Sequence, residues 1–163
     1  MFEIWSVEVC YRPDKRDALG LSVKADIKDD LGLSVESVSF VHVYTINAEI
    51  TENEAKKIAS QLLSDPVIQD YSVNSPLKTN FDWEITVELN PDVTDNVGLA
   101  AKHGIEDLLI GKMREDEFVK YSRKYLLKGK LSEDKIKRIC EDLLANSVIE
   151  KYSYKKGNAK VKK

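Results

Sequence analysis

Four aspartates are the first candidates for chemistry in this chain of 163 residues. They form two pairs with the same spacing, Asp14 with Asp17 and Asp92 with Asp95. Carboxylates gathered in one site can act as general acid and base or bind a divalent cation. Each pair, however, follows a proline that ends an expected strand and precedes an expected helix, where aspartate commonly accepts hydrogen bonds from free backbone N–H groups. We therefore predict that Asp17 and Asp95 are helix N-caps.

The other reactive side chains lack a catalytic or metal-binding spacing. The chain has two histidines, His42 and His103, and two cysteines, Cys10 and Cys140. Their positions suit neither a Cys–His nucleophile nor a zinc site, and the sequence has no glycine-rich phosphate loop. Two unpaired cysteines are typical of a reduced, cytoplasmic protein. We expect no catalytic, cofactor-binding or metal-binding residue in this chain.

A tandem duplication organises the sequence. The dipeptide Tyr71-Ser72 occurs again as Tyr152-Ser153, 81 positions later. The earlier part of the chain repeats after 78 positions, and the difference of three indicates a three-residue insertion in a loop of the second copy. Such a unit is longer than a solenoid repeat and large enough for a small subdomain. The matches at the offset of 78 pair Pro13, Asp14, Asp17 and Gly20 with Pro91, Asp92, Asp95 and Gly98. We predict repeat 1 at residues 1–74, a linker at 75–80, repeat 2 at 81–155 and a basic, disordered tail at 156–163.

The first half of each repeat has the pattern of a strand, a helix and a second strand. Alternating apolar residues over 2–12 predict a strand. The following helix has an apolar i, i+4 stripe that starts at Leu19 in repeat 1 and at Val97 in repeat 2. A middle strand is expected at 35–46 and 117–127, either continuous or bent into a hairpin.

The second half of each repeat predicts another helix and a last strand. Thr51 begins this helix with a capping box, and Ser132 begins its counterpart. The last strands are expected at 67–73 and 148–154. Each repeat is thus β-α-β-α-β, which predicts an α+β fold with a mainly antiparallel sheet and helices on one face. Because such short repeats bury little apolar surface alone, we expect the two to pack on each other as an intramolecular pseudo-dimer.

A glycine occupies the first turn of the first helix in both repeats, as Gly20 and Gly98. Glycine is a poor helix former, so a glycine in both repeats indicates close approach of another backbone or of a ligand. Packing of the helix against a strand is the favoured interpretation.

The middle strands carry a basic side chain within an aromatic and aliphatic face. His42 and Tyr44 stand in repeat 1 where Arg123 and Tyr125 stand in repeat 2. A charge on an apolar face needs an acidic or backbone partner, or else lies at an interface. Both alternatives stay open, and the four residues are our candidates for partner contacts.

The composition argues against two classes of partner. The net charge is -3, and the lysine-rich C-terminal end leaves a more acidic remainder, which disfavours nucleic-acid binding. No apolar run reaches membrane-spanning length, and Met1 is not followed by a basic segment of a signal peptide. We expect a cytoplasmic protein that binds neither nucleic acid nor membrane.

Several segments resemble a known family. Residues 143–154, read as LLANSVIEKYSY, closely resemble the end of PurS, the small subunit of phosphoribosylformylglycinamidine (FGAM) synthase. Residues 91–98, read as PDVTDNVG, are similar to the family's strand-to-helix motif, with Asp92 where the family has glycine. Pro13 to Gly20 and Leu63 to Tyr71 repeat these motifs in the first half of the chain.

The resemblance implies a subunit without an active site. PurS forms dimers and joins the ATP-dependent synthetase subunit PurL to the glutaminase PurQ, in a complex that makes FGAM for purine biosynthesis. ATP, magnesium and glutamine would then be used by the partner subunits, and the fused chain would correspond to a covalent PurS dimer or to the PurS-like N-terminal domain of the long synthase. Where the family often has Gly-Lys in the middle strand, this chain has Val41-His42 and Ser122-Arg123.

Two other hypotheses come from different classes. Duplicated α+β units could hold an anionic metabolite at a helix N-terminus and act as a regulatory module, although Asp17 and Asp95 would repel anions there. A purely structural dimerisation domain is the third hypothesis. Further self-association of the fused chain is compatible with each of them.

Overall fold

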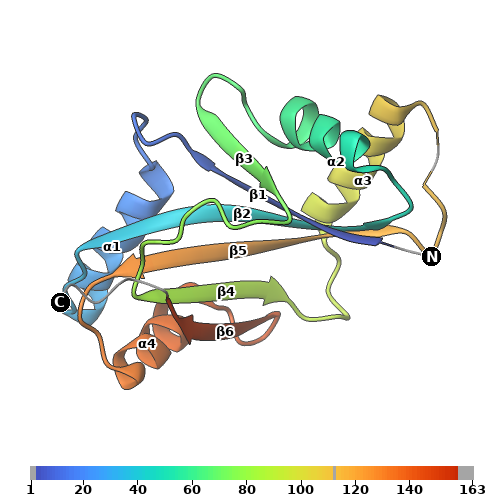
Figure 1. The fold of residues 1–163 in the computed structure, drawn as a ribbon. Helices are drawn as coiled ribbons and strands as arrows, with labels where there is room; N and C mark the ends of the chain where they lie inside the picture. The colour runs from blue at the N-terminus through green and yellow to red at the C-terminus, as the bar shows by residue number, and fades with distance from the viewer. Residues whose placement is uncertain (1–2, 112, 158–163) are drawn as a thin grey trace. The chain divides into compact units, whose positions relative to one another are not determined.

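The computed structural model describes residues 3–111 and 113–157. Each repeat forms the expected β-α-β-α-β succession (Figure 1). The second helix of each repeat continues into a short π-helix. Repeat 1 contains β1 (Glu3–Tyr11), α1 (Ala18–Leu31), β2 (Ser37–Ala48), α2 (Glu52–Ile58), η1 (Ala59–Leu63) and β3 (Gln69–Val73). Repeat 2 contains β4 (Trp83–Leu89), α3 (Asn96–Leu109), β5 (Phe118–Lys128), α4 (Glu133–Ile139), η2 (Cys140–Leu144) and β6 (Glu150–Lys156).

The α+β prediction is confirmed. The described strands follow the hydrogen-bonded order β3-β1-β2-β5-β4-β6, and β1 pairs antiparallel with both β2 and β3, as β4 does with β6. The middle strands β2 and β5 are each continuous, so the hairpin alternative is wrong. Among the described residues, no helix has the length and apolarity needed to cross a bilayer.

The compact units of the structure differ from the sequence repeats. The first unit combines Met1–Lys15, His42–Leu77 and Thr94–Ser122. The second unit combines Arg16–Val41, Lys78–Val93 and Arg123–Lys163. Each unit therefore takes elements from both repeats, because the chain changes unit within β2 and within β5.

The core of the first unit joins strands of repeat 1 to a helix of repeat 2. In the register of β1 and β2, Val7 lies opposite Tyr44 and Val9 opposite His42. Helix α3 packs beside α2 and η1 (Figure 1). The buried side chains of this core are Trp5, Val7, Val9, Ile46, Ala48, Ala55, Ile58, Ala59, Ala101, Ile105 and Val119. Repeat 1 therefore does not complete this core by itself.

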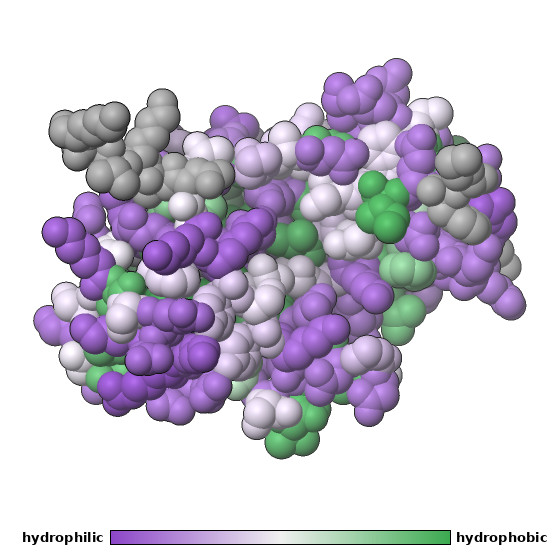
Figure 2. All heavy atoms as spheres, turned by 60° about the horizontal axis from the view of Figure 1, so that its bottom comes forward, coloured by the Kyte–Doolittle hydropathy of each residue, from purple (hydrophilic) through white to green (hydrophobic). Residues whose placement is uncertain are grey.

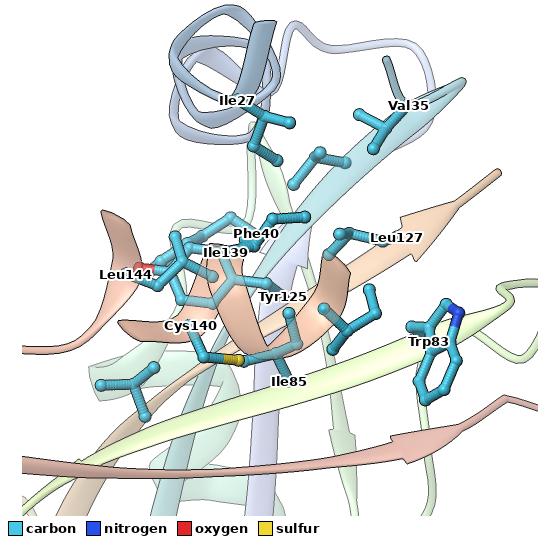
Figure 3. Close-up of a cluster of buried hydrophobic side chains, with 13 residues drawn as sticks. Ile27, Val35, Phe40, Trp83, Ile85, Tyr125, Leu127, Ile139, Cys140 and Leu144 are labelled. Carbon is cyan, nitrogen blue, oxygen red and sulfur yellow. The ribbon is translucent and has the colours of Figure 1, made fainter. Parts of the chain in front are cut away.

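The second unit has the reciprocal composition. Helix α1 of repeat 1 contributes Ile27 to a core whose other helix, α4, contributes Ile139 (Figure 3). Strand β4 pairs with β6 from Trp83, opposite Lys156, to Leu89, opposite Glu150. The buried side chains are Ile27, Val35, Val38, Phe40, Trp83, Ile85, Val87, Tyr125, Leu127, Ile136, Ile139, Cys140 and Leu144. The two repeats thus exchange their first helices: α1 packs on strands of repeat 2, and α3 packs on strands of repeat 1.

Two aspartates connect the first helix of each repeat to its middle strand. Asp17 Oδ1 accepts a hydrogen bond from Gly20 N at 2.8 Å, and its Oδ2 accepts one from Phe40 N at 2.9 Å. Asp95 does the same with Gly98 N and Tyr121 N, both at 2.8 Å. Each carboxylate thus caps a helix and also satisfies a strand N–H, which fixes the start of the helix against the strand.

The second helices have simpler caps. The Thr51 hydroxyl accepts from Glu54 N at 3.1 Å, and Glu54 Oε1 accepts from Thr51 N at 2.9 Å, which completes a capping box. Ser132 accepts from Lys135 N at 3.4 Å, without a reciprocal carboxylate at the third position.

Gly20 and Gly98 lie where a helix approaches a strand backbone. A Cβ added at Gly20 would lie 2.3 Å from Val38 O, and one added at Gly98 would lie 2.3 Å from Val119 O. These distances are far below van der Waals contact, so only glycine allows the approach. The neighbour of both glycines is protein backbone, and a ligand is not needed to explain them.

One detail of the predicted apolar stripe is wrong. Leu19 and Val97 are 44% and 45% exposed, although an apolar i, i+4 stripe usually faces the core. The adjacent glycines bring the helix start so close to the strand that the inward direction is occupied by Gly20 and Gly98 instead.

The C-terminal residues enter the fold further than the predicted boundary. Lys156 is the last residue of β6, and Gly157 N donates to Asp82 O at 2.8 Å. Residues 158–163, the rest of the predicted basic tail, lie outside the described residues.

We expect Gly98→Ala and Gly20→Ala each to lower the free energy of unfolding by about 1–3 kcal/mol, because the added methyl group forces helix and strand apart. Urea unfolding measures the effect. Gly111→Ala is the control, since a Cβ there meets no atom within 4 Å. Equal stabilities of the Gly98 and Gly111 variants would contradict the close approach.

Candidate partner-binding site

His42 and Tyr44 belong to an aromatic cluster in the first unit. His42 Nδ1 lies 2.6 Å from the hydroxyl of Tyr121, within hydrogen-bond distance. The Tyr121 ring also packs on Tyr44, with ring centroids 5.3 Å apart. Burial raises the pKa of the Tyr44 phenol, so Tyr44 is neutral at physiological pH. All three side chains are half-buried, which leaves part of the cluster accessible to a partner.

Arg123 has a different environment in the second unit. Its guanidinium forms a 2.6 Å ion pair with Glu150 and also donates to Leu144 O at 3.2 Å and to the Tyr125 hydroxyl at 3.1 Å. The side chains of Arg123 and Glu150 are 30% and 15% exposed. Of the two alternatives left open by the sequence, the structure shows local pairing, because Glu150 gives the Arg123 charge an acidic partner within the chain.

Tyr125 is a core residue. It is 3% exposed and packs edge-to-face on Phe40, with ring centroids 5.3 Å apart (Figure 3). Burial raises the pKa of its phenol, although the nearby Arg123 guanidinium opposes this effect. A side chain this buried offers almost no surface to a partner, which separates Tyr125 from the half-exposed Tyr44.

The residue that explains Arg123 was missed in the sequence. At the offset of 81, Glu150 corresponds to Gln69, just as Arg123 corresponds to His42. Glu150 Oε1 accepts from Asn146 N at 2.9 Å, and Gln69 Oε1 accepts from Asp65 N at 2.8 Å, so this turn-stabilising bond is common to both repeats. The acid and the base therefore changed together between the repeats. Comparison of the aligned repeats for paired charge changes would have identified Glu150.

The described side chains form no arrangement typical of catalysis. No group of three His, Cys, Asp or Glu side chains in residues 3–111 and 113–157 is placed to hold a metal ion. Burial and the nearby Glu141 raise the pKa of the Cys140 thiol to about 12, so this cysteine is a protonated core residue at neutral pH. The expectation that the chain has no active site stays a prediction.

On the face drawn in Figure 2, hydrophobic side chains form separate small patches among hydrophilic ones. A hollow of about 480 Å³ in the second unit is lined by Glu141, Ala145, Ser147, Glu150, Lys151 and Tyr152. A partner that binds such a surface would rely on a few apolar anchors with charged surroundings.

The fold places this chain among tandem α+β repeat proteins. The polar side chains described above hold its helices and strands together. The family model of PurS, described as phosphoribosylformylglycinamidine (FGAM) synthase, matches residues 5–76 and again residues 82–157. The chain belongs to the PurS family and contains two PurS units in tandem. It therefore has a role in FGAM synthase and purine biosynthesis, together with other subunits of that synthase. A search of curated proteins found no match.

We expect Glu150→Gln to lower the free energy of unfolding by about 1–3 kcal/mol, because the partly buried Arg123 loses its counter-charge while the bond to Asn146 N is kept. The double variant Arg123→His/Glu150→Gln recreates the pair of repeat 1 and should lose less stability than the sum of the single changes. Urea unfolding of this double-mutant cycle measures the coupling.

The control for this cycle is Lys151→Ala, which removes an exposed ion pair with Glu88 and should cost less than about 1 kcal/mol. Strict additivity of the Arg123 and Glu150 changes would show that the ion pair contributes nothing.

Tyr152 offers a test by titration. Its hydroxyl donates to Glu141 at 2.6 Å, and this hydrogen bond raises the pKa of the phenol to about 12 from 10.0. The folded state favours the neutral phenol, so this contribution to stability is present below pH 10.0 and is lost between there and pH 12. Glu141→Gln should return the pKa of Tyr152 toward its ordinary value. Tyrosinate absorbance as a function of pH measures this pKa. The Tyr152→Phe variant lacks the titration of Tyr152 and so identifies it among those of the other tyrosines.

Proposed function

We propose that this chain is the non-catalytic assembly subunit of FGAM synthase. It would dock a PurL-like synthetase subunit and a PurQ-like glutaminase and support transfer of ammonia from the glutaminase to the synthetase. ATP, magnesium and glutamine would be bound by these partners, and the chain would hold no cofactor of its own. We place this assembly in the cytoplasm.

The double match to the PurS family carries the proposal. Each compact unit takes strands from one repeat and a helix from the other. Such mutual completion is what a fused dimer needs, because each core combines side chains of both repeats. Fusion gives the second repeat an effective concentration of about millimolar or higher, so the pair does not depend on the protein concentration.

The difference between the middle strands supports docking to one asymmetric partner. In repeat 1 the basic position is His42, which contacts Tyr121 in a half-buried cluster. In repeat 2 it is Arg123, which is paired with Glu150. We propose that His42 and Tyr44 contact a partner subunit, whereas Arg123 and Tyr125 stabilise the fold. Two identical halves would offer an asymmetric partner the same surface twice, and divergence removes that ambiguity.

The alternative hypothesis, a regulatory module that binds an anionic metabolite at a helix N-terminus, has little support from the two helix starts. An anionic metabolite would need free N–H groups at the start of α1 or α3. The carboxylates of Asp17 and Asp95 already occupy both helix starts and use both oxygens in hydrogen bonds to backbone. We therefore propose no anion site there.

Reconstitution with purified synthetase and glutaminase subunits tests the assembly role. We expect the chain alone to turn over neither ATP nor glutamine. Its omission should abolish most glutamine-dependent FGAM synthesis but leave ammonia-dependent synthesis by the synthetase largely intact, because only the former needs ammonia transfer. An equal loss of both activities would contradict a role in transfer, and no loss would contradict the assembly role itself.

His42→Ala is the matched interface variant. It should weaken binding of a partner subunit by about tenfold, the typical cost of a well-packed interface side chain. Lys57→Ala is the control, since Lys57 is exposed on α2 and lines none of the described hollows, and it should leave binding unchanged. Titration of labelled partner subunit measures both affinities.

A further inference from the structure

Ile110 has an unusual conformation and exposure. It is the C-cap of α3, with a left-handed φ of 53°, and its side chain is 92% exposed. A β-branched residue with positive φ is a genuine outlier, since its Cβ crowds the backbone. The equivalent C-cap of α1 is Gly32, with φ 67°, the residue type that such caps usually carry. Repeat 2 therefore replaces an unstrained cap with a strained residue that also exposes apolar surface.

The surroundings of Ile110 are acidic. Ile110, Gly111, His103, Glu106 and Asp107 line one open hollow of about 630 Å³ at the C-terminal end of α3. Glu106 Oε2 accepts from Met113 N at 3.2 Å, whereas Asp107 is exposed. An apolar side chain with carboxylates beside it suits an apolar recess with a cationic rim.

The chain itself contains such a recess. A hollow of about 420 Å³ along α1, in the second unit, is lined by Leu21, Ala25 and Val35 together with Lys24, Lys28 and Ser34. Lys24 Nζ donates to Glu36 O at 3.0 Å, while Lys28 is exposed at the C-terminal end of α1. At the offset of 78, Lys28 corresponds to Glu106 and Gly32 to Ile110. At these two pairs of positions the repeats differ in charge and in side-chain size, whereas Asp29 and Asp107 are the same residue in both.

We propose that Ile110 of one molecule binds in the α1 hollow of a second copy of this chain, with Asp107 facing Lys28 there. A contact between two Ile110 surfaces is disfavoured, because it would bring the carboxylates of both copies together. The contact is therefore heterologous and leads either to a closed ring or to an open chain of molecules. This self-association goes beyond the role in the synthase and does not depend on it.

A charge swap tests the contact directly. Asp107→Lys and Lys28→Glu should each weaken self-association by about tenfold, as expected for loss of a contact charge pair, and the double variant should recover most of the wild-type affinity. Sedimentation equilibrium over a range of protein concentrations measures the affinities. Failure of the double variant to recover would overturn the pairing of these two residues.

Ile110→Gly tests the apolar contact of Ile110 separately from the charge pair of Asp107 and Lys28. It restores the cap residue of repeat 1, so the melting temperature should rise by about 2–4 °C while self-association weakens by about tenfold. Val67→Ala is the control, since Val67 is another exposed aliphatic residue of the first unit, 71% exposed, and should change neither quantity.

Two further outcomes would overturn the proposal. One is a wild-type chain that stays monomeric at every concentration. The other is a combination of two results: Asp107→Lys and Ile110→Gly abolish binding of the synthetase subunit, and Lys28→Glu leaves self-association unchanged. This combination would identify the surface around Ile110 as a docking site for the synthetase subunit. Both outcomes leave the reconstitution experiment and its interpretation unaffected.

Discussion

The fold depends on the contact between the first helix of each repeat and its middle strand. One aspartate carboxylate accepts a hydrogen bond from the helix start and another from a strand N–H, as in Asp17 with Gly20 and Phe40. The glycine three residues later removes the Cβ that would otherwise meet the strand carbonyl oxygen. The same contact occurs at Asp95 and Gly98, with distances that differ by at most about 0.1 Å. Helix position is therefore set by polar geometry and by the absence of a side chain.

The exchange of helices between the repeats follows from this contact. The middle strands pass from one compact unit to the other, so a helix fixed to one end of its strand packs beside elements of the other repeat. Ile27 and Ile105, the central apolar residues of α1 and α3, are fully buried in cores whose other members come largely from the opposite repeat. Stability is then a property of the two repeats together, which agrees with the small core that a repeat of this length can form alone.

Divergence between the repeats is concentrated in side chains rather than in the backbone. The cap aspartates and close-approach glycines are the same in both, while His42 and Gln69 are replaced by Arg123 and Glu150. A partly buried charge is more stable beside a counter-charge, which gives a physical reason for finding Arg123 and Glu150 together in repeat 2. At the helix ends, the left-handed cap position is Gly32 in α1 and Ile110 in α3, and the isoleucine goes against local preference.

The sequence alone determined the duplication, the order of the elements, the caps at Asp17 and Asp95 and the family, because these depend on local periodicity and on residue types at fixed spacing. Which helix covers which strands became clear from the packing of the folded chain, because an apolar stripe in the sequence does not specify its partner. The tertiary structure also decided the environment of Arg123, because Glu150 is distant in sequence, and the outward direction of Leu19 and Val97, because the glycines beside them take the inward position.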